Sequence, residues 1–305
     1  MNGVGFALGA LASAATALAL ARVASRVGLA DDPSAAPHRK LQDRPVPAIG
    51  GPAILVGLLA IECAGGSPVG GAGPWFALVL AFTLGVADDR TRGGLPPIAL
   101  LLGQAIVATA LVASGWRLCA GDPNPALVAS LAAVVVALNA VNTFDNADGA
   151  ATSVGILGLA VGPAALAGPL VGFLPFNLCS AAPARRGVPI AYLGNSGSHL
   201  LGVLLVLDPV ARFALLVPLL DLARVAFVRL AAGTRPWAGD RRHLAHRMQR
   251  AGLAPALVAA ILVAIAAPAM ITAGAARDGG LVVGLGVLAS TLLFALAVRF
   301  TPSVD

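Results

Sequence analysis

Long apolar runs that carry almost no charge recur along this chain, and they limit its fold more than any other feature. Of its 305 residues, 58% are hydrophobic and 11% are charged, whereas a soluble domain is typically about a quarter charged. A spanning helix needs about 20 apolar residues, with roughly 17 tolerated. The chain is therefore predicted to be an integral membrane protein. Its clear candidate spans are residues 4–21, 47–64, 74–88, 97–114, 125–142, 212–232, 252–274 and 280–298.

Two further apolar stretches do not fit a simple count of spans. Residues 150–180 are too long for one span and short for two, and residues 198–208 make only half a span before Asp208. We therefore expect about 10–11 transmembrane helices in an all-α, polytopic membrane helical bundle. Residues 1–305 are expected to form a single integral membrane domain, with no room for an appended soluble module.

The distribution of lysine and arginine predicts the orientation, because cytoplasmic loops carry an excess of these residues. With the N-terminus outside, only Arg117, Arg212 and Arg277 fall on the outer side. This orientation requires residues 150–180 to cross twice, as a thin or tilted re-entrant hairpin. The basic residues predicted to face the cytoplasm are Arg39, Lys40, Arg44, Arg90, Arg92, Arg185, Arg186, Arg235, Arg241, Arg242, Arg247 and Arg250.

The net charge of +6 suggests an anionic partner, such as a lipid head group, a nucleotide or a lipid phosphate. Nucleic acid is not expected, because the basic residues sit in short loops between apolar spans. The polar loops share the predicted cytoplasmic side of the cell (inner) membrane, and the active site is expected there. These loops are residues 31–51, 88–96, 139–149, 183–199 and 235–250.

Asp88 and Asp89 close one apolar run and form the first candidate site. Adjacent carboxylates at a helix end repel each other, and desolvation raises the cost of keeping them charged. Such a pair is typical of places where a cation or a proton transfer uses it. The alternative is a solvated pair that faces water where the span ends.

The segment LNAVNTFDNADGA is the most specific motif of the chain. Asn139 and Asn142 are three residues apart and share one helix face, and Asp145 and Asp148 follow shortly after. Amide and carboxylate oxygens suit both Mg²⁺ and the rings of a nucleotide. The alternative is an Asx-rich turn that caps the next helix.

The segment AYLGNSGSHLLG is rich in glycine and precedes an apolar helix. Gly194, Gly197 and Ser198 permit a close approach of the backbone, so the N–H groups that enter the helix could receive a phosphate. Glycine at this place is also common simply for helix packing. His199 is expected to be a packed or interhelical polar residue.

The loop GDRRHLAHR places His243, His246 and Arg247 just before a span. Two imidazoles and a guanidinium could bind and neutralise a diphosphate. The alternative is an ordinary basic flank of a membrane helix. Zinc is not expected, because the two histidines have no third ligand nearby in sequence.

Taken together and in order, these motifs resemble those of the polyprenyl-phosphate N-acetylhexosamine-1-phosphate transferases. The resemblance extends over nearly the whole chain and also includes RKLQDRPVPAIGG, GFLPFN and LLVPLLDLARVAFVRL. It implies transfer of an N-acetylhexosamine-1-phosphate from a UDP-sugar to polyprenyl (undecaprenyl) phosphate, with release of UMP, in cell-wall or surface-glycan synthesis. It implies Mg²⁺, or Mn²⁺ in its place, as cofactor, and it leaves a homodimer open.

The resemblance also implies roles for individual residues. Asp88 and Asp89 would act on the lipid phosphate as base or by charge positioning, and Asn142 would bind Mg²⁺. The remaining substrate-binding residues would be Asn139, Asp145 and Asp148 at the nucleotide, and His243, His246 and Arg247 at the diphosphate. Asn195 stands where the family usually has a metal-binding Asp, Gln42 where it has His, and Leu100 where it has Lys.

Two rival functions follow from these observations. Asn195 brings no charge to the metal, so a weakened or inactive homologue that binds a lipid phosphate or a partner is one alternative. A transporter is the other, and it would need ionisable residues deep within several spans. Only Glu62 and Arg224 fit that expectation, because most charges lie at one interface.

Overall fold

The computed structural model describes residues 2–24, 26, 28–31, 45–66, 69–91, 93–119, 123–178, 188–237, 239–276 and 279–303. The predicted orientation uses several residues outside these ranges, and Gln42 is outside them as well. The basic ones are Arg39, Lys40, Arg44, Arg92, Arg185, Arg186 and Arg277.

The described residues form twelve α-helices and one two-stranded ladder, which confirms the predicted all-α membrane bundle. The first half contains α1 (Asn2–Ala21), β1 (Ala30–Asp31), β2 (Val46–Pro47), α2 (Gly50–Cys63), α3 (Ala72–Arg90), α4 (Pro97–Ala113), α5 (Pro123–Phe144) and α6 (Ala150–Val161). The second half contains α7 (Ala167–Asn177), α8 (Gly194–Leu207), α9 (Leu216–Ala231), α10 (Leu244–Arg250), α11 (Pro255–Ala275) and α12 (Gly280–Phe300).

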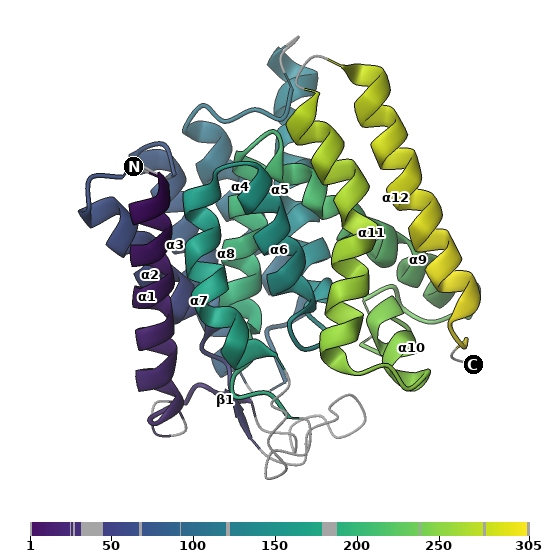
Figure 1. Ribbon diagram of the computed structural model, residues 1–305, viewed down its shortest axis with the longest axis horizontal. Helices are drawn as coiled ribbons and strands as arrows, with labels where there is room; N and C mark the ends of the chain where they lie inside the picture. The colour runs from purple at the N-terminus through teal and green to yellow at the C-terminus, as the bar shows by residue number, and fades with distance from the viewer. Residues whose placement is uncertain are drawn as a thin grey trace.

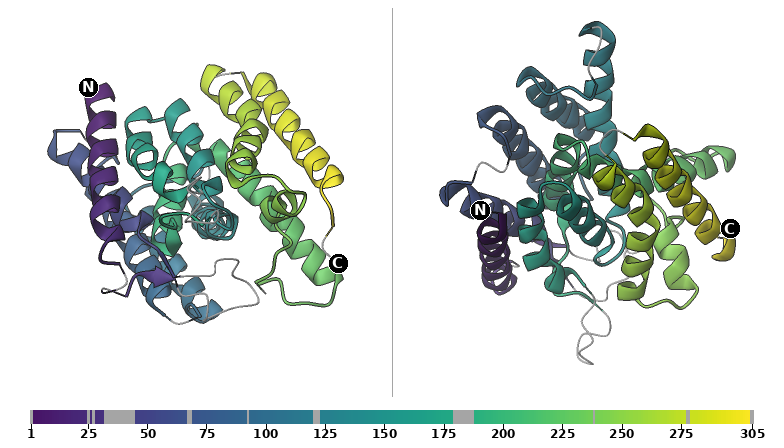
Figure 2. Two further views of the ribbon diagram at one scale, coloured as in Figure 1. Left: turned by 60° about the horizontal axis from the view of Figure 1, so that its bottom comes forward. Right: turned by 45° about the horizontal axis from the view of Figure 1, so that its top comes forward.

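The helices run up and down the bundle. Figure 1 shows the N-terminus and the C-terminus at opposite ends, and Figure 2 shows α1 and α12 on opposite flanks. Five helices are long and apolar enough to cross a membrane, namely α1, α3, α5, α11 and α12. The predicted spans 47–64 and 97–114 are shorter in the structure, because α2 has 14 residues and α4 has 17.

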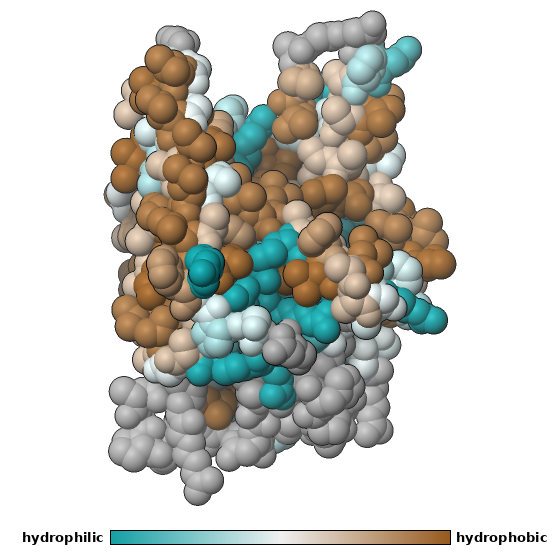
Figure 3. All heavy atoms as spheres, turned by 90° about the vertical axis from the view of Figure 1, so that its right-hand side faces the viewer, coloured by the Kyte–Doolittle hydropathy of each residue, from teal (hydrophilic) through white to brown (hydrophobic). Residues whose placement is uncertain are grey.

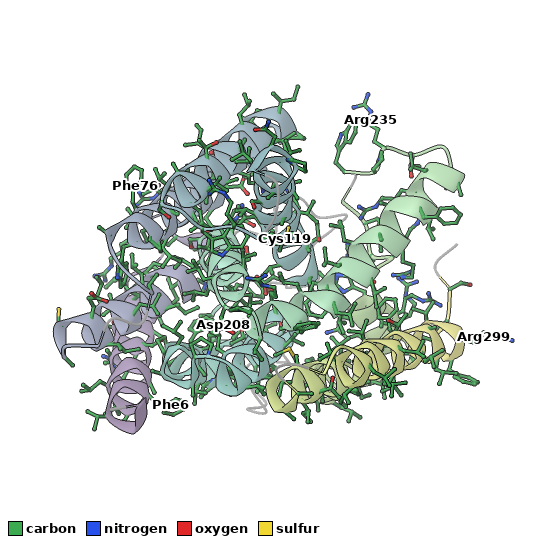
Figure 4. All side chains as sticks on the ribbon, turned by 90° about the horizontal axis from the view of Figure 1, so that it is seen from above. Phe6, Phe76, Cys119, Asp208, Arg235 and Arg299 are labelled. Carbon is green, nitrogen blue, oxygen red and sulfur yellow. The ribbon has the colours of Figure 1, made fainter. Side chains whose placement is uncertain are left out.

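The predicted span 212–232 differs more. Its first residues form a 3₁₀ turn, Ala211–Leu215, and α9 follows with 16 residues. The carboxylate of Asp208 accepts the N–H groups of Val210 and Ala211, both at 2.8 Å, and thereby caps this turn. Figure 4 shows Asp208 inside the bundle, whereas Phe6 and Phe76 lie at its outer faces.

Within the predicted hairpin, residues 150–178 are described and form two helices, α6 and α7, that pack against each other. A 3₁₀ turn, Ala164–Leu166, joins α6 and α7, which have 12 and 11 residues. At 1.5 Å per residue each is shorter than a hydrocarbon core of about 30 Å. Gly168 and Gly172 leave no room for a Cβ against the backbone of α1, so α7 lies directly on that helix.

The short helix α8 lies at the centre of the bundle, and its residues from Ser196 to Val206 are all buried. It packs against α2, α3 and α5. Gly51 on α2 and Gly85 on α3 face the first turn of α8, where a Cβ would overlap Ser196. These two glycines therefore allow the N-terminus of α8 to sit between two neighbouring helices.

One end of the bundle collects the polar segments. The β1–β2 ladder and a bridge between Ala48 and Tyr192 tie the entrance of α2 to the entrance of α8. Figure 1 shows β1 and α10 at this same end, away from the N-terminus. The motifs at the ends of α3 and α5 and before α8 thus lie on the same side as the histidine loop.

Candidate active site

Asp89, in the last turn of α3, caps the first turn of α8. Its Oδ1 accepts the N–H of Asn195 at 2.8 Å, and its Oδ2 accepts the N–H and the hydroxyl of Ser196 at 3.0 and 2.9 Å. A carboxylate is well suited to the N-terminus of a helix, whose free N–H groups attract anions. The sequence predicts that N–H groups at this helix start could receive a phosphate. In the structure, those of Asn195 and Ser196 donate to Asp89.

Asp88 faces a different segment. Its side chain is only 6% exposed, and its Oδ1 accepts the N–H of Leu95 in the loop between α3 and α4. Gly94, at φ +86°, lies against this same oxygen. Asp88 thus orders the loop after α3, while Asp89 joins α3 to α8. Neither carboxylate is simply a solvated charge at a helix end.

Asn142 lies within reach of the start of α8. Its Oδ1 accepts a hydrogen bond from the hydroxyl of Ser198 at 3.1 Å, and that hydroxyl lies equally close to the carbonyl oxygen of Asn195. The structure therefore brings together the two predicted metal-binding positions, Asn142 and Asn195, although they are far apart in sequence. Ser198 is the link between them.

Asn139 makes its side-chain hydrogen bonds inside the bundle. Its Nδ2 donates to Oε1 of Gln104 at 2.6 Å and to the carbonyl oxygen of Val135 at 2.8 Å. Gln104 in turn lies 3.3 Å from Nε2 of His199, whose Nδ1 donates to the carbonyl oxygen of Asn195 at 2.6 Å. Asn139 therefore belongs to an interhelical network, and so does His199, as expected, while the role of Asn139 at the nucleotide stays a prediction.

Asp145 and Asp148 lie in the turn between α5 and α6, close to the end of α3. Burial, followed by the charges of Asp89 and Asp148, raises the pKa of Asp145 to about 8. Burial raises the pKa of Asp148 to about 7. Desolvation is the main cause of both shifts, and the charges of neighbouring carboxylates add to the shift of Asp145 alone. The turn itself is ordered by Asn146, whose Nδ2 donates to the carbonyl oxygen of Thr143.

This group of carboxylates and amides fits a hydrated divalent cation. Among the described residues, no three His, Cys, Asp or Glu side chains gather closely enough to hold a metal by themselves. Mg²⁺ usually keeps several waters and binds one or two carboxylates together with substrate phosphates, so it does not need such a cage. The raised pKa values of Asp145 and Asp148 show a shortage of positive charge that a cation would relieve.

His243 is held in place by Asp221 of α9, which sequence reasoning did not single out. Its Nδ1 donates to Oδ2 of Asp221 at 2.8 Å, while Oδ1 of Asp221 accepts the N–H of Leu244 and a hydrogen bond from Arg224. Because Nδ1 carries the proton toward the carboxylate, Nε2 is the nitrogen left for a ligand. The i, i+3 pair of Asp221 and Arg224 was the sequence signal that could have revealed it.

The other two members of the histidine loop behave differently. Burial, together with the charges of His243 and Arg241, lowers the pKa of His246 to about 4 although its contact with Gln249 opposes the shift, so His246 is a neutral ring at pH 7. Arg247 donates to the carbonyl oxygens of Val298, Thr301 and Pro302. Arg247 thereby caps the C-terminus of α12 through Nε and Nη2, and its role at a diphosphate stays a prediction.

The two charged residues that a transporter would use both have local partners. Glu62 accepts a hydrogen bond from Nε1 of Trp75 at 3.1 Å, between α2 and α3. Arg224 donates to Asp221 and to the carbonyl oxygen of Arg242. Glu62 therefore joins α2 to α3, and Arg224 joins α9 to the loop before α10.

The fold and these residues define a multi-pass membrane protein with an acidic group and a basic group at the same end. The acidic group consists of Asp89, Asp145 and Asp148 with Asn142 and Asn195, and the basic group surrounds α10. Such a combination suits a cation and a phosphate ester at the membrane surface.

Comparison with curated proteins identifies the class of enzyme to which this chain is related. It is 26% identical to the undecaprenyl-phosphate alpha-N-acetylglucosaminyl 1-phosphate transferase of Yersinia pestis, over 76% of this chain and 72% of that protein. It is 24% identical to the protein of the same name from Escherichia coli, over 83% and 77% of the two chains. It is 28% identical to the decaprenyl-phosphate N-acetylglucosaminephosphotransferase of Mycobacterium leprae, over 70% and 69%.

These homologues are phosphoglycosyltransferases by name, and the similarity covers most of the chain. The predicted resemblance to polyprenyl-phosphate sugar-1-phosphate transferases is thereby confirmed. No protein-family model matches the chain.

Proposed function

We propose that this protein transfers N-acetylglucosamine-1-phosphate from a UDP-sugar to a polyprenyl phosphate and releases UMP. The observation that carries the proposal is the meeting of Asp89, Asn142 and Asn195 at one end of the bundle, in a chain homologous to such transferases. The acceptor is a lipid and the donor is soluble, so the reaction belongs at a membrane face. We assign this face to the cytoplasm and the product to cell-wall or surface-glycan synthesis.

The acidic group would bind the donor diphosphate through a divalent cation. Asn142 and Asn195 would supply amide oxygens, and Asp145 and Asp148 would supply negative charge, while Mg²⁺ would neutralise the phosphates. Transfer of a phosphoryl-type group depends mainly on positioning and charge neutralisation. The hydrogen bonds of Asp89 and Asn142 to the first turn of α8 support the proposed positioning, and the cation and the basic group would neutralise the charge.

His243 would face the donor from the basic group. With Nδ1–H held by Asp221, the imidazolium form of His243 would donate from Nε2 to a phosphate oxygen, and the adjacent guanidinium groups add positive charge. Asp89 would act mainly by fixing the first turn of α8, which carries Asn195. Asp88 is the residue that we propose to act on the lipid phosphate. It also orders the loop after α3, because it accepts the N–H of Leu95.

A transfer assay tests this function. Membranes that contain the protein are supplied with undecaprenyl phosphate and a small panel of radiolabelled UDP-sugars, with Mg²⁺ or with EDTA. We expect labelled lipid and equimolar UMP from UDP-N-acetylglucosamine, only with the metal. Absence of labelled lipid with every sugar, from a protein that is correctly folded, would contradict the proposal.

Asn195 supports a second candidate, a homologue with weakened or lost activity. The family position usually carries an Asp that binds the metal, and an amide contributes no charge there. An Asn195→Asp variant separates the two candidates. A strong rise in turnover would indicate an intact site limited by its metal, whereas an inactive variant that still binds polyprenyl phosphate would favour a binding protein.

A further inference from the structure

A small cavity on the flank of the bundle is lined mainly by arginines. Its volume is about 90 Å³, which is room for several water molecules or one phosphate-sized group. The lining residues come from α9, the loop before α10, α10 itself and the segment after α12. They are Arg224, Val228, Arg242, Arg247 and Ser303.

The positive charge around this cavity is not balanced within the described part of the chain. Asp240 binds Arg229 through both oxygens, at 2.9 and 3.0 Å, and lies 3.8 Å from Arg242. Asp221 is shared by Arg224 and His243. The guanidinium groups of this region thus outnumber its carboxylates. They belong to Arg224, Arg229, Arg242 and Arg247, and the carboxylates to Asp221 and Asp240. Burial and then the charge of Arg224 lower the pKa of Arg247, which shows that the two cations are close.

Two nitrogens of the lining arginines lack a hydrogen-bond partner. Nε of Arg224 and Nη1 of Arg242 are both buried, and nothing in the described residues accepts from them. Buried polar groups are nearly always paired in native proteins, and an unpaired charged donor is especially costly. Arg224 and Arg242 both line the cavity, so an anion there would lie beside the side chains that carry these donors and would balance the excess charge.

The surroundings of the cavity indicate that the anion carries apolar chains. Phe227 on α9 is 72% exposed and Phe300 at the end of α12 is 80% exposed, and Leu230 and Trp237 are exposed nearby in sequence. Trp237 is of the residue type that is typical of the boundary between lipid and water, and the exposed Phe and Leu side chains are apolar. Figure 3 shows hydrophilic side chains gathered in a hollow between columns of apolar side chains on this flank.

We propose that this cavity binds the phosphate headgroup of an anionic membrane phospholipid. This cavity lies within the basic group around α10 but shares no lining residue with the acidic group on α3, α5 and α8, and binding of a phospholipid there goes beyond the proposed transfer reaction. The bound phosphate would accept hydrogen bonds from Arg224 and Arg242, while its acyl chains lie along the apolar side chains of α9 and α12. It would also hold in place the loop that leads to His243.

Thermal unfolding in lipid nanodiscs tests this site without any assay of activity. The protein is placed in phosphatidylcholine discs, alone or with added phosphatidylglycerol, and no polyprenyl phosphate is present. We expect phosphatidylglycerol to raise the unfolding temperature by about 2–4 °C, the shift that a moderate gain in stability gives a chain of this size. Arg242→Gln should abolish the shift.

Matched controls separate the cavity from general surface charge. Arg299, in the last turn of α12, is exposed and points away from the bundle in Figure 4, so Arg299→Gln should keep the full shift. If Arg242→Gln keeps it, or if both variants reduce it equally, the site is refuted. If inorganic phosphate in pure phosphatidylcholine discs gives the same shift, the ligand is a soluble phosphate and the lipid assignment is wrong.

A second pair of variants serves if Arg242→Gln does not fold. Ser303 lines the cavity near the end of the chain and is exposed. Ser303→Asp introduces a negative charge and should abolish the shift with phosphatidylglycerol, whereas Ser303→Asn should retain it. Equal shifts in these two variants would overturn the proposal.

Discussion

Asp89 and Ser196 are 107 residues apart in sequence, yet the carboxylate of Asp89 accepts both the backbone N–H and the hydroxyl of Ser196. This contact makes the end of α3 the N-terminal cap of α8. It ties the acidic pair to the motif that carries Asn195, so substitutions of Asp89 act on structure as well as on chemistry.

Asp89→Ala should therefore lower the thermal unfolding temperature of the protein more than Asp88→Ala does. Three hydrogen bonds to a charged acceptor disappear at position 89, and one disappears at position 88. Hydrogen bonds to charged groups contribute about 1.5–3 kcal/mol each, and they are not additive. The measurement is thermal unfolding in detergent, and equal shifts in the two variants would contradict the assignment of Asp89 as the cap.

Asp221→Asn should lower the rate of the proposed transfer without preventing folding. An amide at this position removes the negative charge beside His243, and that charge favours the cationic ring whose Nδ1–H and Nε2–H donate to Asp221 and to a donor phosphate. Loss of such a supporting contact typically costs on the order of 10–100-fold. The rate and its pH profile are compared with those of Asp240→Asn, which breaks the pair with Arg229. An unchanged profile for Asp221→Asn would contradict the positioning role.

The unfolding temperature of the metal-free protein should fall as the pH rises from 6 to 9. The folded protein raises the pKa of Asp145 to about 8 and of Asp148 to about 7, from an ordinary value of 3.8. The native state therefore holds protons that the unfolded state has released. This stabilisation is complete below the unfolded pKa and is lost as the pH rises through 7 and 8. Asp145→Asn should flatten the pH dependence measured in EDTA.

The affinity for Mg²⁺ should rise over the same pH range. A cation binds the carboxylate form, so its binding must release the protons held by Asp145 and Asp148. Isothermal titration at pH 6.5 and pH 8.5 would measure this difference, with buffers of different ionisation enthalpy to count the protons. An affinity that does not depend on pH would place the cation away from these two side chains.

His199→Leu should destabilise the protein more than the double variant Gln104→Leu, His199→Leu does. Removing the imidazole alone leaves the amide of Gln104 buried without its partner, and an unsatisfied buried group costs about 1–3 kcal/mol. Removing both side chains takes away that penalty, while Asn139, which loses Gln104, keeps its hydrogen bond to the carbonyl oxygen of Val135. A double-mutant cycle by thermal unfolding tests the coupling, and strictly additive effects would show that the network is not coupled.

The sequence predicted the helices well where the signal was local. The apolar runs that became α1, α5, α11 and α12 matched closely, because hydropathy depends only on neighbouring residues. Residues 212–232 were less predictable, since the side chain of Asp208 starts a 3₁₀ turn there and α9 carries Asp221 and Arg229 on its buried side. The candidate site was predicted as a set of motifs, without the partner of any side chain.

The sequence by itself determined that this protein lies in a membrane and that its polar motifs stand at helix ends, because the cost of placing charge in lipid acts on every segment separately. Only the tertiary structure decided which polar groups meet. In the structure, Asp89 accepts hydrogen bonds from the first turn of α8, and Asn139 donates to Gln104. His243 donates to Asp221, and Arg247 donates to carbonyl oxygens at the end of α12. These pairings depend on which helices pack side by side, and hydropathy is nearly the same for every such arrangement.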